Sequence, residues 1–529
     1  MSLFTSLLAG LYLACLFGLF LYGINSYVLI RLHRRHRRAA QAADARIQAR
    51  ARNDPEAMLP AVTVQLPIFN ERYVVDRLLQ AAARLDWPSD RLEIQVLDDS
   101  TDDTREIVSQ LVQGYRAAGL DMVHLHRTVR TGYKAGALKD GLAVCRGEFV
   151  AIFDADFVPE PDFLRRTTPY FKDPGVGMVQ TRWGHLNREY SLLTTGQAFG
   201  IDGHFGVEQG SRAWAGLYLN FNGTAGIWRK TAIENAGGWQ ADTLTEDLDL
   251  SYRAQLSGWR LVFLPDVVSP AELPVQIQGF KSQQRRWAKG SIQTARKLIS
   301  SLLRAPGSWF KKYQAIIHLT HYAAHPLMLL VAIASPLLLY LDWFFVSWHS
   351  LLASTAFFCL ATFGPSALYT YSQRVLYPDW RRRLLFLPSL MLLGTGIALS
   401  NTRAVLEGLF CHAGDFVRTP KFAIQSRQDS WRTKRYRDRF SWTAVGELCL
   451  SAYSAFGVYL FLSRGRFLIG PFLVLYTLGF AYVGSLTLIH SLGPRSHRIP
   501  GAIRPALLRW GLILIVPLLL LTSVVCLAH

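Results

Sequence analysis

The sequence predicts an α/β domain with a mainly parallel sheet, flanked by transmembrane and interfacial α-helices. The chain has 529 residues, half of them hydrophobic, which is too long for one ordinary domain. Apolar runs of membrane-spanning length lie at the start and in the C-terminal part, and residues 61–298 between them are of mixed polarity. Within residues 61–298, short β-rich runs alternate with amphipathic stretches, the pattern of open parallel sheets.

The first apolar run, Leu3 to Leu29, predicts an uncleaved membrane span within residues 1–30. It has no basic region before it and no small-residue cleavage site after it, so a secretory signal is not indicated. The basic cluster Arg31 to Arg38 follows at once. By the positive-inside rule, the N-terminus is expected outside, and residues 31–60 are expected to be a basic cytoplasmic linker to the α/β domain.

Residues 299–529 predict a membrane domain with about five further spans, and so about six in the whole chain. The predicted spans are two hairpins and a last helix: 316–345 with 351–371, 442–462 with 467–492, and 507–527. Residues 384–410 are apolar too, but a crossing there would place the basic stretch Arg418 to Arg439 outside. They therefore predict an interfacial or re-entrant helix on the cytoplasmic side.

The net charge of +19 indicates a membrane surface rather than a nucleic acid as partner. Much of the excess falls beside apolar runs, in Arg31 to Arg38, Arg381 to Arg383 and Arg427 to Arg439, as in positive-inside loops that face anionic lipids. The six cysteines are scattered and form no CxxC or Cys/His cluster. Neither a disulfide framework nor a structural zinc site is indicated.

Acidic pairs follow two of the predicted strands, at the sheet edge where open α/β folds bind ligands. The strand 148–153 runs into Asp154 and Asp156, whose carboxylates can converge on one hard cation that grips a diphosphate. Mg²⁺ or Mn²⁺ is expected, since without a cation the two charges would repel each other. The strand 93–97 runs into Asp98 and Asp99, for which helix capping is an equally good interpretation.

The segment Gln283 to Trp287 combines groups that suit a phosphorylated sugar. The guanidinium of Arg286 can bind a diphosphate through two parallel hydrogen bonds, and Trp287 offers a flat apolar face to a sugar ring. An amphipathic helix at a membrane surface also favours Arg and Trp. The two interpretations are compatible, and we expect both to hold.

Four motifs occur in the order and approximate spacing of the processive family 2 glycosyltransferases: Asp98-Asp99, Asp154-Ala155-Asp156, Thr245-Glu246-Asp247 and Gln283-Gln284-Arg285-Arg286-Trp287. The chain thus resembles cellulose, chitin and hyaluronan synthases. Residues 132–138, 221–226 and 259–265 are most similar to the plant cellulose-synthase-like A and C groups and their bacterial relatives, which make mannan, glucomannan or β-1,4-glucan backbones. The resemblance covers residues 60–425 and implies a GT-A-type nucleotide-sugar-binding fold.

The resemblance also implies roles for individual residues. The donor site is expected at Asp98, Asp99, Lys134, Asp154, Gln283 and Arg286, with Mg²⁺ or Mn²⁺ on Asp154 and Asp156, and the acceptor site at Phe221, Asn222, Gly223, Glu246 and Trp287. Asp247 would be the general base of one in-line displacement, which inverts an α-linked donor into a β-linked product. Glu246 would raise the pKa of Asp247 or cap a helix. Lys134 has a solvated helix lysine as its alternative interpretation.

Residues 412–424 resemble the gating loop of cellulose synthases through Phe416, Thr419 and Lys421, with Arg418 where that pattern has Val. A basic juxtamembrane loop is the alternative interpretation. The predicted function is transfer of glucose or mannose from UDP-glucose or GDP-mannose to a growing β-1,4-linked polysaccharide, coupled to membrane translocation. A single-addition transferase acting on a membrane lipid, and a non-catalytic transport or scaffold subunit, are the alternatives.

The cellular setting follows from the donor that the resemblance implies. Nucleotide-sugars are made in the cytoplasm, so the α/β domain is expected on the cytoplasmic side of a multi-pass membrane protein. The membrane would be a bacterial inner membrane or, in a eukaryote, a Golgi membrane. Accessory subunits or a second copy of the chain are compatible partners, besides the donor, the polysaccharide acceptor and membrane lipids.

Overall fold

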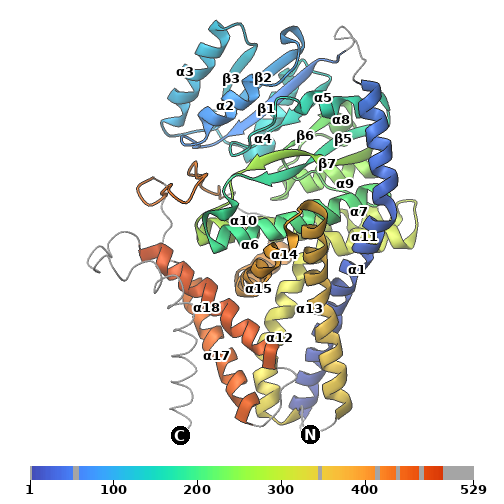
Figure 1. The fold of residues 1–529 in the computed structure, drawn as a ribbon, viewed down its shortest axis with the longest axis vertical. Helices are drawn as coiled ribbons and strands as arrows, with labels where there is room; N and C mark the ends of the chain where they lie inside the picture. The colour runs from blue at the N-terminus through green and yellow to red at the C-terminus, as the bar shows by residue number, and fades with distance from the viewer. Residues whose placement is uncertain are drawn as a thin grey trace.

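The computed structural model describes residues 3–51, 59–343, 348–411, 417–435, 441–463 and 470–492. A sheet domain lies above a group of long helices, and further helices cross between the two parts (Figure 1). The predicted combination of an α/β domain with flanking apolar helices is confirmed.

Seven strands form one sheet in the order β3-β2-β1-β4-β6-β5-β7. Their bounds are β1 (Val62–Ile68), β2 (Leu92–Asp98), β3 (Met122–His126), β4 (Phe149–Ile152), β5 (Val176–His185), β6 (Gly226–Arg229) and β7 (Arg260–Ala271). Only the two pairs made by β6 are antiparallel, so the predicted mainly parallel sheet is confirmed. The residues that follow β1, β2 and β4 therefore lie along one edge of the sheet.

Helices cover both faces of the sheet, because alternate residues of a strand point to opposite sides. Phe149 and Ala151 of β4 pack into one apolar core, and Val150 and Ile152 pack into another. The first core includes α2 (Val75–Ala83), α3 (Thr104–Ala117) and α5 (Phe163–Thr167). The second includes α4 (Tyr133–Val144), α8 (Lys230–Asn235) and α9 (Glu246–Leu256).

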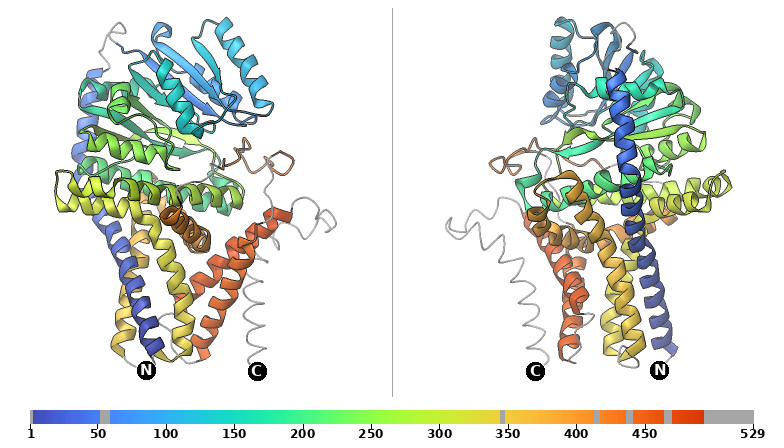
Figure 2. Two further views of the ribbon diagram at one scale, coloured as in Figure 1. Left: turned by 180° about the vertical axis from the view of Figure 1, so that it is seen from behind. Right: turned by 45° about the vertical axis from the view of Figure 1, so that its right-hand side comes forward.

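Two helical segments cross beneath the sheet domain in both views of Figure 2. One consists of α6 (Leu192–Gly203), a π-helical turn (His204–Glu208) and α7 (Gln209–Trp214); the other is α10 (Ile277–Arg304). The remaining described helices are α11 (Trp309–Thr320), α12 (Ala324–Tyr340), α13 (Trp348–Leu376), α14 (Trp380–Arg383), α15 (Leu387–Gly396), α16 (Ala398–Phe410), α17 (Thr443–Ser463) and α18 (Gly470–Leu492).

Four helices in the described part of the chain are long and apolar enough to cross a membrane: α1 (Leu3–Ala51), Trp309–Tyr340, Thr443–Ser463 and Pro471–Ser491. A fifth results if Trp380–Gly396 and Ala398–Phe410, which meet at a bend of 47°, are one span. That bend is compatible with the re-entrant helix predicted for residues 384–410. The last predicted span, 507–527, lies outside the described residues.

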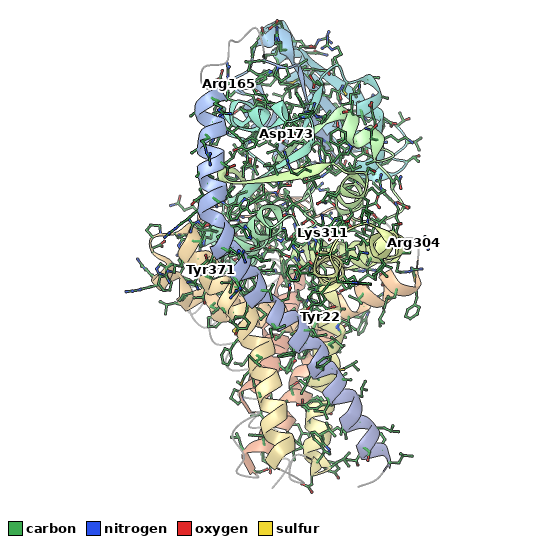
Figure 3. All side chains as sticks on the ribbon, turned by 90° about the vertical axis from the view of Figure 1, so that its right-hand side faces the viewer. Tyr22, Arg165, Asp173, Arg304, Lys311 and Tyr371 are labelled. Atoms are coloured by element: carbon green, nitrogen blue, oxygen red, sulfur yellow. The ribbon has the colours of Figure 1, made fainter. Side chains whose placement is uncertain are left out.

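Helix α1 extends well beyond the predicted first span, since it continues through the basic segment to Ala51. Residues 31–51 contain no glycine or proline and are rich in Ala, Arg and Gln, which favour a helix. The upper end of α1 contacts the sheet domain, where Gln48 donates to the carbonyl of Arg166 at 2.7 Å. In Figure 3, Tyr22 lies on the lower part of α1 and Arg165 beside its upper end.

Candidate active site

A cavity opens at the carboxyl edge of the sheet, between the ends of β1 and β4 and the helices α9 and α10. Most of the residues predicted for the donor site, the acceptor site, the metal pair, the general base and the gating-like loop line this cavity. They are Asp99, Lys134, Asp154, Asp156, Asn222, Gly223, Glu246, Asp247, Gln283, Arg286, Trp287, Thr419 and Lys421. Segments far apart in the sequence therefore meet in one place.

Asp154 follows β4 and is held by two neighbours. Its backbone N–H donates to the hydroxyl of Thr224 at 2.8 Å, and the ammonium of Lys134 donates to its carboxylate at 2.5 Å. Lys134 also donates to the carbonyl of Gly223 at 2.8 Å. Lys134 is thus a cavity residue rather than a solvated helix lysine.

Asp156 has a second lysine as its partner, supplied from the far end of the sequence. The ammonium of Lys421 donates to the Asp156 carboxylate at 2.6 Å and to the carbonyl of Glu272 at 2.7 Å. Each carboxylate of the Asp154–Asp156 pair is therefore balanced by one buried or half-buried cation.

The chemistry of the Asp154–Asp156 pair suits a hard cation. Two carboxylates offer oxygen ligands and leave further positions open, as Mg²⁺ or Mn²⁺ requires when it also binds water and a diphosphate. Both residues line the cavity. A different group of possible ligands, Asp98, His124 and His126, has its ligand atoms within 4.8 Å of one another.

Asp98 and Asp99 point to different places, as neighbouring residues at a strand end do. Asp98 is completely buried and does not line the cavity. Its carboxylate lies 2.9 Å from Nε2 of His124 and accepts the Ser100 N–H at 2.8 Å. Burial opposes the ionised form, but these hydrogen bonds outweigh it and lower the pKa of Asp98.

Asp99, by contrast, lines the cavity. The guanidinium of Arg127 donates to both of its carboxylate oxygens, each at 2.7 Å. A second arginine, Arg130, lies 3.6 Å above the ring of Phe69, which also lines the cavity. This end of the cavity therefore offers a flat aromatic and cationic surface beside a paired carboxylate.

Asp247 lies in the first turn of α9, beside Glu246. Burial, and then the charge of Glu246, raise the pKa of Asp247 to about 7, while Lys134 and Arg286 oppose the rise. Burial also raises the pKa of Glu246. Glu246 raises the pKa of Asp247 and lines the cavity, and it does not cap α9, whose N-cap residue is Thr245.

Helix α10 braces the turn that precedes Asp247. The side chain of Gln293 accepts the Leu244 N–H at 3.0 Å. Gly290 lies so close that a Cβ added there would sit 2.6 Å from Thr245. The same helix carries Gln283, Arg286 and Trp287 to the cavity.

The segment 221–223 has only part of its side chains at the cavity. Phe221 is completely buried and packs edge-on against Trp228, with ring centres 5.7 Å apart, so it does not line the cavity. Asn222 does line it, as does Gly223, which has a φ of 81°. A Cβ on Gly223 would lie 2.8 Å from the Asp247 carboxylate.

Residues 417–424 of the gating-like loop close one side of the cavity. Thr419 and Lys421 line it, whereas Phe416 lies outside the described residues. Arg418 forms an ion pair with Glu71 at 3.3 Å. Burial raises the pKa of Glu71 to about 8, against the opposing charge of Arg418.

Sequence reasoning missed two cavity carboxylates, Glu71 and Glu272. Glu272 accepts the backbone N–H of Phe422 at 2.8 Å and so holds the loop. Each residue follows a strand, β1 or β7, at the edge where Asp154 lies. Their position after a strand is the sequence feature that could have identified them as site residues.

Residues 60–290 match the sequence profile of the family described as glycosyltransferase-like family 2. Glucomannan 4-beta-mannosyltransferase 2 of Arabidopsis thaliana is 46% identical over 264 residues, which are 49% of this chain and 49% of that protein. Glucomannan 4-beta-mannosyltransferase 1 of rice (Oryza sativa subsp. japonica) is 44% identical over 260 residues, 48% and 50% of the two chains. The chain thus matches about half the length of these relatives.

Solved structures with a similar arrangement include the mannosyltransferase PcManGT from Pyrobaculum calidifontis in complex with GDP-Man and Mn²⁺. It is 23% identical, covers 73% of this chain and 99% of its own, and has a TM-score of 0.47. S. aureus TarS 1-349 in complex with UDP-GlcNAc is 16% identical, covers 61% and 92% of the two chains, and has a TM-score of 0.36.

Proposed function

We propose that residues 60–290 of this chain form a family 2 glycosyltransferase domain and that the chain is an inverting β-glycan mannosyltransferase, which takes mannose from GDP-mannose. The acceptor is a growing β-1,4-linked polysaccharide. The observation that carries the proposal is the meeting of Asp154, Asp247 and Trp287 in one cavity. The relatives' names favour mannose over glucose.

The donor is bound at the sheet edge. Asp154 and Asp156 would hold Mg²⁺ or Mn²⁺, which supplies positive charge to the diphosphate as it leaves. The guanidinium of Arg286 lines the same cavity and can donate to the diphosphate oxygens. Asp99 and Arg130 lie at the end of the cavity formed by β1 and β2, where a nucleoside would fit.

Asp247 is the general base of this proposal. A pKa near 7 keeps a useful fraction of the carboxylate ionised at neutral pH while leaving it basic enough to accept a proton. The acceptor hydroxyl gives its proton to Asp247 as its oxygen attacks the anomeric carbon, and the diphosphate leaves from the opposite face. The single displacement gives a β-linked product from an α-linked donor.

The proposal also includes translocation of the polymer across the membrane. Trp287 packs against a cluster that includes Tyr322. The Tyr322 hydroxyl donates to the side chain of Gln284 at 3.2 Å, and the His325 ring lies 2.9 Å from the side chain of Asn401. Polar side chains among apolar helices commonly mark a substrate path, so these residues support an exit from the acceptor site towards the membrane helices.

The membrane setting completes the proposal. The basic segments beside the apolar helices support a cytoplasmic catalytic domain. The membrane would be a bacterial inner membrane, or a Golgi membrane in a eukaryote. In this arrangement the first span is residues 1–30 and the linker is residues 31–60. The catalytic domain would be residues 61–298, and the membrane domain with the gating-like loop would be residues 299–529.

The test uses the full-length protein in lipid nanodiscs with radiolabelled GDP-mannose or UDP-glucose and Mn²⁺. We expect high-molecular-weight label from GDP-mannose that a β-1,4-mannanase degrades. Label found only in an organic extract would show a lipid acceptor instead. Asp247→Asn should abolish incorporation, whereas Asp90→Asn, which changes an exposed carboxylate of the same domain, should leave it intact.

Removal of divalent cations is a second prediction. EDTA should abolish incorporation, and added Mn²⁺ or Mg²⁺ should restore it, because Asp154 and Asp156 would bind the diphosphate only through a cation. In Asp154→Asn or Asp156→Asn, restoration should fail at every cation concentration tried. Full incorporation in excess EDTA would contradict the proposed role of both residues.

A further inference from the structure

The π-helical turn His204–Glu208 joins α6 to α7 without interrupting the helical path. Such turns insert an extra residue into a helix and are frequent at functional sites. Here the turn places two polar side chains in contact, with Nδ1 of His204 lying 3.0 Å from the Glu208 carboxylate.

The Glu208 carboxylate is anchored on its other side. Arg212, which is 1% exposed, donates from Nε to Glu208 at 3.0 Å. Arg212 also donates to the carbonyl of Gln314 in α11 at 3.2 Å. A buried guanidinium with these two partners has little freedom to move, and it keeps Glu208 ionised by lowering its pKa against burial.

The other nitrogen of His204 faces the candidate acceptor site. Nε2 lies 2.9 Å from Oδ1 of Asn222 and 3.1 Å from the side-chain amide of Gln209. Asn222 lines the cavity, and His204 does not, so His204 reaches the cavity only through Asn222. The contact between Nδ1 and the Glu208 carboxylate fixes the orientation of the imidazole ring.

We propose that His204, held by Glu208 and Arg212, is a positioning residue that orients the side chain of Asn222 and thereby the acceptor sugar. This inference rests on the proposed function. A Cβ added to Gly223, the neighbour of Asn222, would lie 2.8 Å from the Asp247 carboxylate, so Asn222 lies close to the place of the acceptor sugar whose hydroxyl Asp247 deprotonates. A fixed amide selects which hydroxyl faces the anomeric carbon, and small misplacements there cost large factors in rate.

Loss of this orientation has a characteristic consequence. When no acceptor hydroxyl is well placed, water can attack the anomeric carbon instead, releasing GDP and free mannose while Asp247 takes the proton of water. Polymer formation then falls more than donor consumption does. Donor binding should change little, because the hydrogen bonds described for His204 and Asn222 do not involve Asp154 or Asp156.

The test compares GDP released with mannose incorporated, for the full-length protein in nanodiscs with GDP-mannose and Mn²⁺. For His204→Ala we expect incorporation to fall about tenfold or more. GDP released per incorporated mannose should rise, and the KM for GDP-mannose should change by less than about twofold. His204→Gln keeps a polar atom for Asn222 and should restore part of the incorporation.

His33→Ala is the matched control, because His33 is a buried histidine whose ring bonds Tyr371 away from the cavity. It should leave the ratio of GDP to incorporated mannose unchanged. If His204→Ala does not fold, as judged by thermal unfolding, His204→Gln and Asn222→Ala carry the same test. An unchanged ratio in these variants would overturn the inference, whereas a wild type that incorporates no mannose would overturn the proposed function itself.

Discussion

At the scale of single residues, the cavity is a set of opposite charges brought close together. Lys134 balances Asp154, Lys421 balances Asp156, and Arg418 balances Glu71. Charges removed from water are costly unless they are paired. Asp247 differs, because its nearest charged neighbour along the chain is another carboxylate, and this makes it the candidate general base of the proposed reaction.

The proposed role of Asp247 predicts the pH dependence of transfer. Its pKa is raised to about 7, and only the ionised form can accept a proton, so kcat/KM should rise with pH through about 7. Glu246→Gln removes the negative charge beside Asp247 and so lowers the pKa of Asp247. The pH at which kcat/KM rises should therefore be lower in this variant. Initial rates across a pH series check this. If kcat/KM rises at the same pH in the variant and the wild type, Glu246 does not affect the pKa of Asp247.

At the scale of elements, α10 both supports the turn before α9 and lines the cavity. It carries three site residues and packs closely on the turn before α9 through Gly290. Because the same helix lies between the sheet domain and the long helices, a shift of α10 would move Trp287 and Asp247 together (Figure 1). The geometry of the candidate acceptor site therefore depends on how α10 packs against the turn before α9.

The packing of α10 gives a prediction for Gly290→Ala. The added methyl group would lie 2.6 Å from Thr245 and 2.8 Å from its backbone nitrogen, so the turn must move. We expect overpacking to cost about 1–3 kcal/mol of folding stability and polymer incorporation to fall about tenfold or more. Gly114→Ala, in α3 with open space around it, is the control. Equal activity of the two variants would contradict the role of this contact.

At the scale of the whole molecule, the sheet domain is joined to the long helices by charged and close contacts. Lys281 of α10 forms an ion pair with Glu447 of α17 at 2.6 Å, and Lys281 also donates to Thr487 of α18 at 3.0 Å. Within the group of long helices, Gly364 of α13 lies against the backbone of Gly23 in α1, as small residues allow between closely packed helices. The contacts of Lys281 hold α10, and so the cavity that α10 lines, relative to α17 and α18.

The Lys281–Glu447 pair can be tested by a double-mutant cycle. Both side chains are almost completely buried, so Lys281→Met alone leaves an unpaired buried carboxylate and should destabilise the protein by about 3 kcal/mol or more. Adding Glu447→Leu should recover most of that loss. Thermal unfolding in detergent measures both. Additive losses in the double variant would show that the two side chains do not stabilise one another.

Much of the sheet could be predicted, because hydrophobic runs that end in carboxylates are strong local signals. The strands predicted at 93–97 and 148–153 correspond to β2 and β4, with each end shifted by one residue. The long α1 was underestimated, since the prediction stopped at the edge of the apolar run although helix-forming residues continue.

By itself the sequence determined which chemical groups the site would contain: carboxylates after strands, an acidic pair at 246–247, and an arginine and a tryptophan on one segment. Such groups are recognisable because their type and spacing are local properties. Only the tertiary structure decided that Asp99 and not Asp98 faces the cavity, that Phe221 belongs to the core, and that Lys421 reaches Asp156. Those outcomes depend on which strand face is covered and on contacts across hundreds of residues, which no local pattern encodes.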